Sequence, residues 1–232
     1  MEFQAPMQQM GYDRAIVVFS PEGRMYQVEY ARKAVDKAST VVGVAFAGGV
    51  VLAATRVLQN LMIPDRVEKI AKIDEHIGAA TCGILADCRV LVDVARVGAQ
   101  VNRITYDSRI ETNTLVKEIS DRVQRFTQMG GIRPYGAGLL FAGEGKLYEV
   151  DPSGTMRQWK AHALGRGTKE AKEYLINNFK DGLSKFDAIK LAVASLRAGQ
   201  EKTTLKSTEI GVDENGKFYK LQEQELKKAV TE

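Results

Sequence analysis

A chain of 232 residues is long enough for one large hydrophobic core or two small ones. Apolar residues make up 44% and charged residues 27%, the ordinary balance of a folded globular domain. The net charge of +4 is a small excess spread along the chain, with no basic run interleaved with aromatics, so we expect no nucleic-acid partner.

Metal, disulfide and membrane chemistry are also poorly supported. Cys82 and Cys88 fit no common ligand spacing and make no disulfide framework, so we predict no metal and no cofactor. The apolar stretch from Val41 to Ala54 is too short to span a bilayer and is interrupted by two glycines. Residues 1–11 lack the basic start and apolar core of a signal peptide. We expect a cytoplasmic protein without a membrane partner.

The first elements in chain order are a tail and a helix. Residues 1–11 are rich in Met and Gln, show no periodicity and predict a mobile tail. The segment Gln27–Lys37 predicts a short helix, with Val28, Ala31, Ala34 and Val35 on one stripe.

Apolar strand pairs and two helices follow. The predicted hairpins are Thr40–Phe46 with Val50–Ala54, and Lys69–Asp74 with Ile77–Cys82. Their continuous apolar character indicates cover on both faces. A predicted helix over Leu85–Val101 is apolar on two sides, so it needs one partner in its own domain and another in a neighbouring chain. A second helix, roughly Ile110 to Gln128, has one apolar stripe.

The second half repeats this order. The predicted strands are Tyr135–Ala142, Lys146–Val150 and Thr155–Ala163; the helices lie near Thr168–Phe179 and Asp187–Ala198; a hairpin joins Glu209–Val212 to Lys217–Leu221; and a short charged helix starts at Gln222. Asp151–Gly154 predicts a β-turn, and Ser184 with Asp187 a capping box. Strand and helix blocks in this order predict an α+β fold, two stacked sheets between helix layers, in one domain.

The usual catalytic signatures are missing: no Walker A loop, G-x-S-x-G elbow or H-E-x-x-H occurs. The run Gly165–Thr168 before a helix could hold an anion, but we favour a tight corner with Thr168 as N-cap. Strand alternation places Lys69 on the same side as Val67, Ala71 and Ile73. A lysine on an apolar stripe must snorkel, pair with an anion or line a site, and snorkelling is the default interpretation.

One long N-terminal pattern carries a family resemblance. The segments YDRAI (Tyr12–Ile16) and FSPEGRMYQVEYA (Phe19–Ala31) resemble the signature opening of proteasome α subunits, and of the archaeal kind in particular. Weaker matches follow at STVVG (39–43), VEKI (67–70), GGIRPYG (130–136) and DPSG (151–154).

The resemblance implies a fold and a set of partners. The fold is the four-layer αββα sandwich of N-terminal nucleophile hydrolases, with residues 1–11 as gate tail, 12–38 as signature and N-terminal helix, and 39–232 as core. The implied partners are six further copies in a homo-heptameric α ring, proteasome β subunits, ATPase or other activators, and unfolded polypeptide substrates.

The resemblance also implies roles for individual residues. Those matched to the gate tail and the cluster that holds the gate open are Tyr12, Asp13, Arg14, Pro21 and Tyr30. Those matched to the pocket that receives an activator's C-terminal carboxylate are Lys69, Met25 and Ala38, the last replacing a family glycine. The loop narrowing the axial channel is matched by Met129, Gly130, Gly131 and Ile132, with Met129 where an aromatic is common.

Catalysis by this chain is not expected. Aligned on Val42-Gly43, the nucleophile position of β subunits holds Ser39, the acidic position holds Thr55, and the lysine is retained as Lys69. Thirty-eight residues precede Ser39, so its nitrogen is in a peptide bond and cannot be the free amine of an N-terminal nucleophile. Two alternatives stay open: a hydrolase that matures by cleavage before Ser39 or Thr40, and a stand-alone ring-forming interaction module.

Overall fold

The computed structural model describes residues 17–57, 60–63, 68–199, 204, 207–222 and 225. The predicted tail and the site residues Tyr12, Asp13 and Arg14 lie outside the described residues. The elements in chain order are α2 (Tyr26–Lys37), β1 (Val41–Phe46), β2 (Gly49–Thr55), β3 (Ile70–Asp74), β4 (Ile77–Gly83), α3 (Leu85–Tyr106), α4 (Thr112–Gln128), β5 (Ala137–Gly143), β6 (Lys146–Val150), β7 (Met156–Trp159), β8 (Ala161–Leu164), α5 (Thr168–Asn178), α6 (Lys185–Gly199), β9 (Thr208–Glu214) and β10 (Lys217–Lys220).

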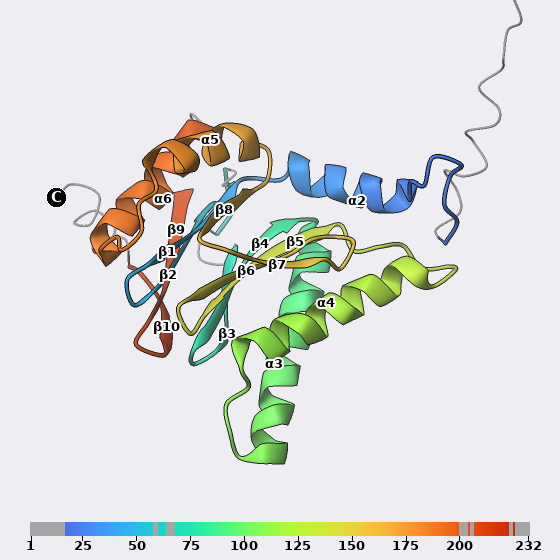
Figure 1. The fold of residues 1–232 in the computed structure, drawn as a ribbon, viewed down its shortest axis with the longest axis horizontal. Helices are drawn as coiled ribbons and strands as arrows, with labels where there is room; N and C mark the ends of the chain where they lie inside the picture. Colours follow the sequence, from blue (N-terminus) through green and yellow to red (C-terminus); the bar gives the residue numbers. More distant parts are fainter. Residues whose placement is uncertain are drawn as a thin grey trace, which may run out of the picture.

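The strands form two antiparallel five-stranded sheets. One has the order β10-β9-β2-β1-β8 and the other the order β3-β4-β5-β6-β7. Figure 1 shows the sheets stacked on each other, with α5 and α6 outside the first and α3 and α4 outside the second. The predicted α+β sandwich of two sheets between helix layers is therefore confirmed.

The core is divided by these layers into three clusters. Between the sheets lie side chains such as Leu52, Leu140 and Leu147, all fully buried. The other two clusters fill the spaces between each sheet and its helix pair. The sheets approach closely because Gly43 has no side chain: a Cβ there would lie 2.6 Å from Leu147 Cδ1. Strands buried on both faces explain the continuous apolar runs in the sequence.

The prediction of a single strand over Thr155–Ala163 is wrong, because the chain changes sheets within this segment. Residues Met156–Trp159 pair with β6, whereas Ala161–Leu164 pair with β1 in the other sheet. The break at Lys160 has a physical cause, because one strand cannot be hydrogen-bonded in both sheets at once. After the break, β8 pairs with β1 and becomes the edge strand of the first sheet.

Helix α3 follows the predicted double stripe only in part. Cys88, Leu91 and Val92 are buried against the second sheet, as expected, but Leu85 is exposed at the start of the helix. Val101 is exposed as well, in keeping with the expectation of a second partner outside the chain.

The predicted cap of α6 is confirmed for Ser184, because its Oγ accepts a hydrogen bond from the Asp187 N–H at 3.2 Å. Of the predicted C-terminal helix, the structure describes only Gln222, which is not helical, and Glu225.

Candidate functional site

The most unusual side chain in the structure is Lys69, which is only 4% exposed. Its Nζ donates hydrogen bonds to Ser39 O at 2.6 Å and to Ser39 Oγ at 2.7 Å. The snorkelling interpretation is therefore wrong. Strand alternation did not apply because β3 begins only at Ile70, and the ammonium is directed to Ser39, two residues before β1 of the other sheet. Buried ammonium groups need such acceptors, because an unpaired charge in the interior is costly.

The surroundings of Lys69 disfavour the charged form of its side chain. Burial lowers the pKa of Lys69, and the nearby Glu209 carboxylate acts in the opposite direction. Glu209 is engaged elsewhere, since its Oε2 accepts from the Lys69 backbone N–H at 2.9 Å. Burial also raises the pKa of the neighbouring Cys82 thiol to about 11, so this group stays neutral at ordinary pH. An incoming anion at this place would strengthen the charged form of the lysine.

Helix α2 leads directly into this pair. Its C-cap is Ala38, which precedes Ser39, whereas Met25 is the N-cap at the opposite end. Twelve residues of helix separate the two ends by about 18 Å. The structure thus brings Ala38 and Lys69 together within one chain but places Met25 far from them. A single pocket within one chain therefore cannot include all three residues.

The corner between β8 and α5 packs against the segment that joins α2 to β1. Gly165 has φ +107, and a Cβ at this position would lie 2.9 Å from Thr40 Cα. The Gly167 N–H donates to Thr40 Oγ1 at 3.1 Å. The predicted tight corner is confirmed, with one correction: Gly167 is the N-cap of α5, and Thr168 is its first helical residue.

The N-terminal end of α2 carries the predicted turn. The Gly23 N–H donates to Ser20 O at 2.8 Å, which closes a β-turn with Pro21 at its first central position. Gly23 has φ +74, a conformation that favours glycine. Tyr30 lies on α2, 41% exposed, with its ring 6.4 Å from that of Tyr26. Pro21 and Tyr30 are therefore both exposed near the start of α2.

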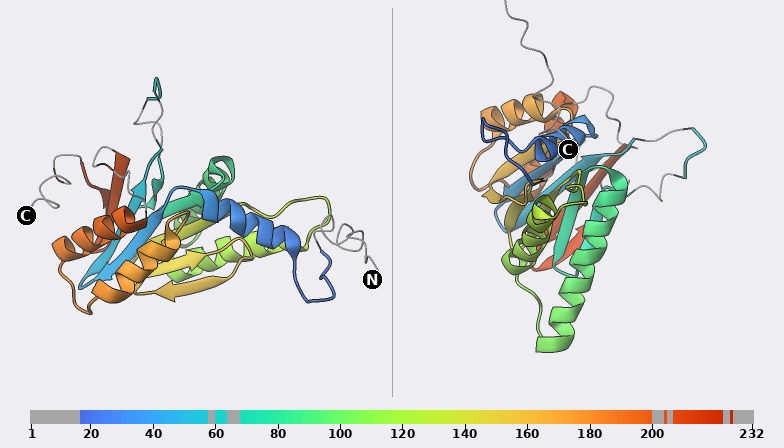
Figure 2. Two further views of the ribbon diagram at one scale, coloured as in Figure 1. Left: turned by 90° about the horizontal axis from the view of Figure 1, so that it is seen from above. Right: turned by 90° about the vertical axis from the view of Figure 1, so that its right-hand side faces the viewer.

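The predicted channel loop follows α4. Met129 is the C-cap of that helix and is 42% exposed, and a Cβ at Gly130 or Gly131 would meet nothing within 4 Å. Figure 1 and the left view of Figure 2 show this loop at the same end of the molecule as the turn that precedes α2. Residues more than a hundred positions apart in the sequence thus form one projecting end.

An ion pair that the sequence did not reveal fixes the base of this loop. Asp87, in the first turn of α3, accepts from Arg133 at 2.5 and 2.7 Å and from the Gly136 N–H at 2.8 Å. The hydrogen bond from Arg133 lowers the pKa of Asp87 despite its burial. The available signal was an aspartate next to Cys88 on the buried side of a predicted helix. Its partner could not be named, because the two lie 46 residues apart.

Two negative findings concern the part of the chain that the structure describes. No helix there is long and apolar enough to cross a membrane. No group of three or more His, Cys, Asp or Glu side chains among those residues could hold a metal ion.

Comparisons with known proteins agree with this architecture. Residues 35–213 match the proteasome subunit family, and residues 12–34 match the N-terminal signature of its A-type members. The proteasome α subunit of Methanobrevibacter smithii is 44% identical, over 98% of this chain and 94% of the relative. The corresponding protein of Thermococcus kodakarensis is 46% identical, over 100% and 91%. That of Archaeoglobus fulgidus is 47% identical, over 94% and 92%.

The two sheets between helix layers fit the architecture of a proteasome subunit. The N-terminal signature of A-type members covers residues 12–34 and extends into α2, the helix before β1. The chain belongs to the family of α-type proteasome subunits.

Proposed function

We propose that this chain is a non-catalytic wall and gate subunit of a 20S proteasome core particle. In this proposal seven copies form an outer α ring, which stacks on rings of β subunits and controls the entry of unfolded polypeptides. An outer-ring structural role fits a member of the α-type family. The particle is proposed to be cytoplasmic, which cell fractionation would test.

The observation that carries the non-catalytic role is the path of the chain through Ser39. Helix α2 ends at Lys37, and the chain continues through Ala38 to Ser39, so the Ser39 nitrogen is part of a peptide bond. The second β strand ends at Thr55, which offers a hydroxyl where an N-terminal nucleophile site needs a carboxylate. Ser39 and Lys69 touch, but neither the free amine nor the acid is present.

The gating role is supported by the arrangement at the two ends of α2. The turn at Pro21 and the loop at Met129 project from one end of the molecule. Lys69 and Ser39 lie at the other end of the helix. A rigid helix between them offers a way for an event at Lys69 to reach the turn, because helices move as units.

The docking role of Lys69 carries a physical requirement. Its ammonium is occupied by Ser39 O and Ser39 Oγ, so an activator carboxylate must displace or share these acceptors. A carboxylate is a stronger acceptor for an ammonium than a carbonyl or hydroxyl. Exchange of these partners is therefore favourable if the pocket admits the carboxylate and keeps water out.

A second candidate is favoured by one specific contact. The 2.7 Å approach of Lys69 Nζ to Ser39 Oγ is the geometry that a nucleophile and its base share. Cleavage before Ser39 would add the missing amine and give a self-processing hydrolase.

Native mass spectrometry of the full chain expressed alone separates these proposals. Intact chains assembled in sevens, or in doubled sevens, are the result expected for the ring-forming role. A small oligomer whose mass begins at Ser39 or Thr40 would contradict it and identify the hydrolase. An intact monomer would contradict both. Co-purification with β subunits separates the core-particle subunit from a stand-alone ring-forming interaction module.

A further inference from the structure

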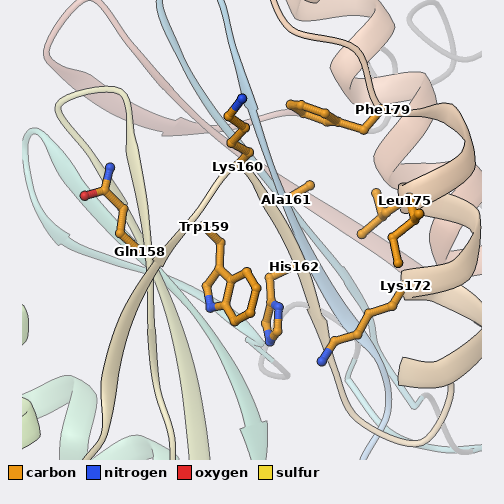
Figure 3. A pocket seen from close by; sticks show the side chains of 9 residues that line it. Gln158, Trp159, Lys160, Ala161, His162, Lys172, Leu175 and Phe179 are labelled. Atoms are coloured by element: carbon orange, nitrogen blue, oxygen red, sulfur yellow. The ribbon is translucent and has the colours of Figure 1, made fainter.

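A second candidate site lies far along the sequence from the proposed gate and docking residues. A cavity of about 400 Å³ opens between the β7–β8 break and α5 (Figure 3). This volume is within the range of small-molecule sites in proteins. Its walls are mainly apolar and aromatic, and they include Trp159, Ala161, Leu175, Ile176 and Phe179.

The inner wall contains a buried polar group. His162 is 4% exposed, and its ring stacks on that of Trp159 with centroids 4.1 Å apart. Its Nε2 lies 3.4 Å from Glu149 Oε2, yet this buried atom makes no hydrogen bond. The Trp159 N–H donates to the same carboxylate at 2.8 Å. The wall is therefore rigid, with its aromatic rings fixed in place.

The charged side chains around the cavity differ in how closely they are paired. Glu149 lies 3.8 Å from Arg157, and Lys160 pairs with Asp181 at 2.8 Å. Lys172 is attracted at longer range by the carboxylates of Glu149 and Asp36. Figure 3 shows its side chain reaching from α5 toward His162. Among the described residues, its ammonium at the mouth of the apolar cavity thus has distant counter-charges but no close acceptor.

Partial burial makes this lysine a receptor for an anion. Burial lowers the pKa of Lys172, because the apolar walls remove water from its ammonium. A negative group placed there would restore the lost solvation by a charge-assisted hydrogen bond. An ammonium without a close acceptor matches one negative group that can reach it, and the apolar walls match a hydrocarbon chain or ring.

We propose that this cavity binds a small organic carboxylate with an apolar body. The carboxylate pairs with Lys172, and the apolar body lies against Trp159, Leu175 and Phe179. This site is separate from the proposed gate, and it does not depend on the assignment of Lys69.

The single tryptophan of the chain makes the test direct, because Trp159 is the only one and lies in the cavity wall. The full-length assembled protein is titrated with 3-phenylpropanoate, and Trp159 fluorescence is followed. The neutral isostere 3-phenylpropanamide is titrated in parallel. We expect a saturable change with the carboxylate and a dissociation constant about tenfold weaker for the amide. Equal binding of the two, or no saturable change, would overturn the proposal.

A pair of variants assigns the charge. Lys172→Gln should weaken 3-phenylpropanoate binding by about tenfold and remove its advantage over the amide. Lys169→Gln, in the same helix but exposed and outside the cavity, is the matched control and should bind like the unchanged protein. An equal loss in both variants would mean that general surface charge attracts the ligand, and the proposal would fail.

Comparing ligand binding to the assembled and the dissociated protein provides a last test. If 3-phenylpropanoate binds only to dissociated chains and never to the assembled form, the cavity is a contact between subunits, and the small-molecule proposal is wrong. That outcome would leave the ring function untouched.

Discussion

At the scale of single residues, the structure changes the meaning of Lys69 more than that of any other side chain. The sequence shows a lysine in an apolar stripe; the fold shows an ammonium joined to Ser39 by two hydrogen bonds. The same contact serves two hypotheses, docking of a carboxylate and activation of a nucleophile. Substitutions that separate the ammonium from the hydroxyl distinguish them.

Lys69→Ala is expected to abolish the activator-stimulated hydrolysis of peptides by particles assembled with β subunits, while rings still form. The physical reason is the loss of the only cation at the junction of α2 and β1 that the proposal uses. Peptide hydrolysis with and without an activator measures the effect. Lys72→Ala is the matched control, since Lys72 is exposed on β3 only three residues away. Unchanged stimulation in Lys69→Ala would remove this residue from the pocket.

Ser39→Ala keeps the ammonium and removes only the hydroxyl. We expect activator stimulation to remain within about twofold of the unchanged particle, since the carbonyl of residue 39 still accepts from Lys69. Intact mass of the chain is recorded in the same samples. Loss of a processed form on this substitution would instead support Ser39 as a nucleophile.

The Asp87–Arg133 pair predicts a dependence of stability on pH. The pKa of Asp87 is lowered on folding, so its contribution is fully present above the ordinary aspartate pKa near 4. It is lost as pH falls through the lower value in the folded state. Asp87→Asn should cost about 1–2 kcal/mol of unfolding free energy at neutral pH and progressively less in acid. Denaturation at several pH values checks this, and an unchanged difference in acid would contradict it.

At the scale of elements, periodicity predicted most helices and strands, because burial on one or two faces leaves a clear mark in the sequence. It failed between β7 and β8. Their residues resemble one strand, since nothing local tells Met156–Trp159 from Ala161–Leu164. Which sheet each segment joins depends on free edges made by strands far away in the chain.

The turn between β6 and β7 gives a test of close packing. Gly154 has φ +80, and a Cβ there would lie 2.5 to 2.7 Å from atoms of Gln124 in α4. Gly145 has a similar φ of +70 but open space around it. Gly145→Ala should cost about 1 kcal/mol from backbone strain alone, whereas Gly154→Ala should cost about 2 kcal/mol more because α4 must shift. Chemical denaturation compares the two, and equal costs would refute the packing argument.

At the scale of the whole molecule, the gate proposal rests on segments that meet only after folding. The turn at Pro21 and the loop at Met129 share one end of the chain's long axis (Figure 2). A tail attached at that end is well placed to cover a central channel. In a ring of identical chains, seven such ends would meet at the axis.

Deletion of residues 2–11 is expected to raise the basal entry of peptides several-fold without changing ring assembly. The reason is removal of the proposed plug, which lowers the barrier to diffusion through the ring. Hydrolysis of a small peptide by the assembled particle, without activator, measures it. Replacement of the same residues by a Gly/Ser stretch of equal length is the control for bulk. Hydrolysis as slow as in the unchanged particle would show that the tail is not the gate.

The class of fold, the family and most element positions could be predicted from the amino-acid sequence alone. Continuous apolar strands, helical stripes and turn residues are local or short-range patterns, and the N-terminal signature is one uninterrupted segment. The other features emerged only from the folded chain. The sheet change at Lys160, the partner of Asp87, the direction of Lys69 and the cavity at Trp159 all depend on contacts between distant segments. Such contacts leave no mark on the spacing of residues, because they form only when the layers pack.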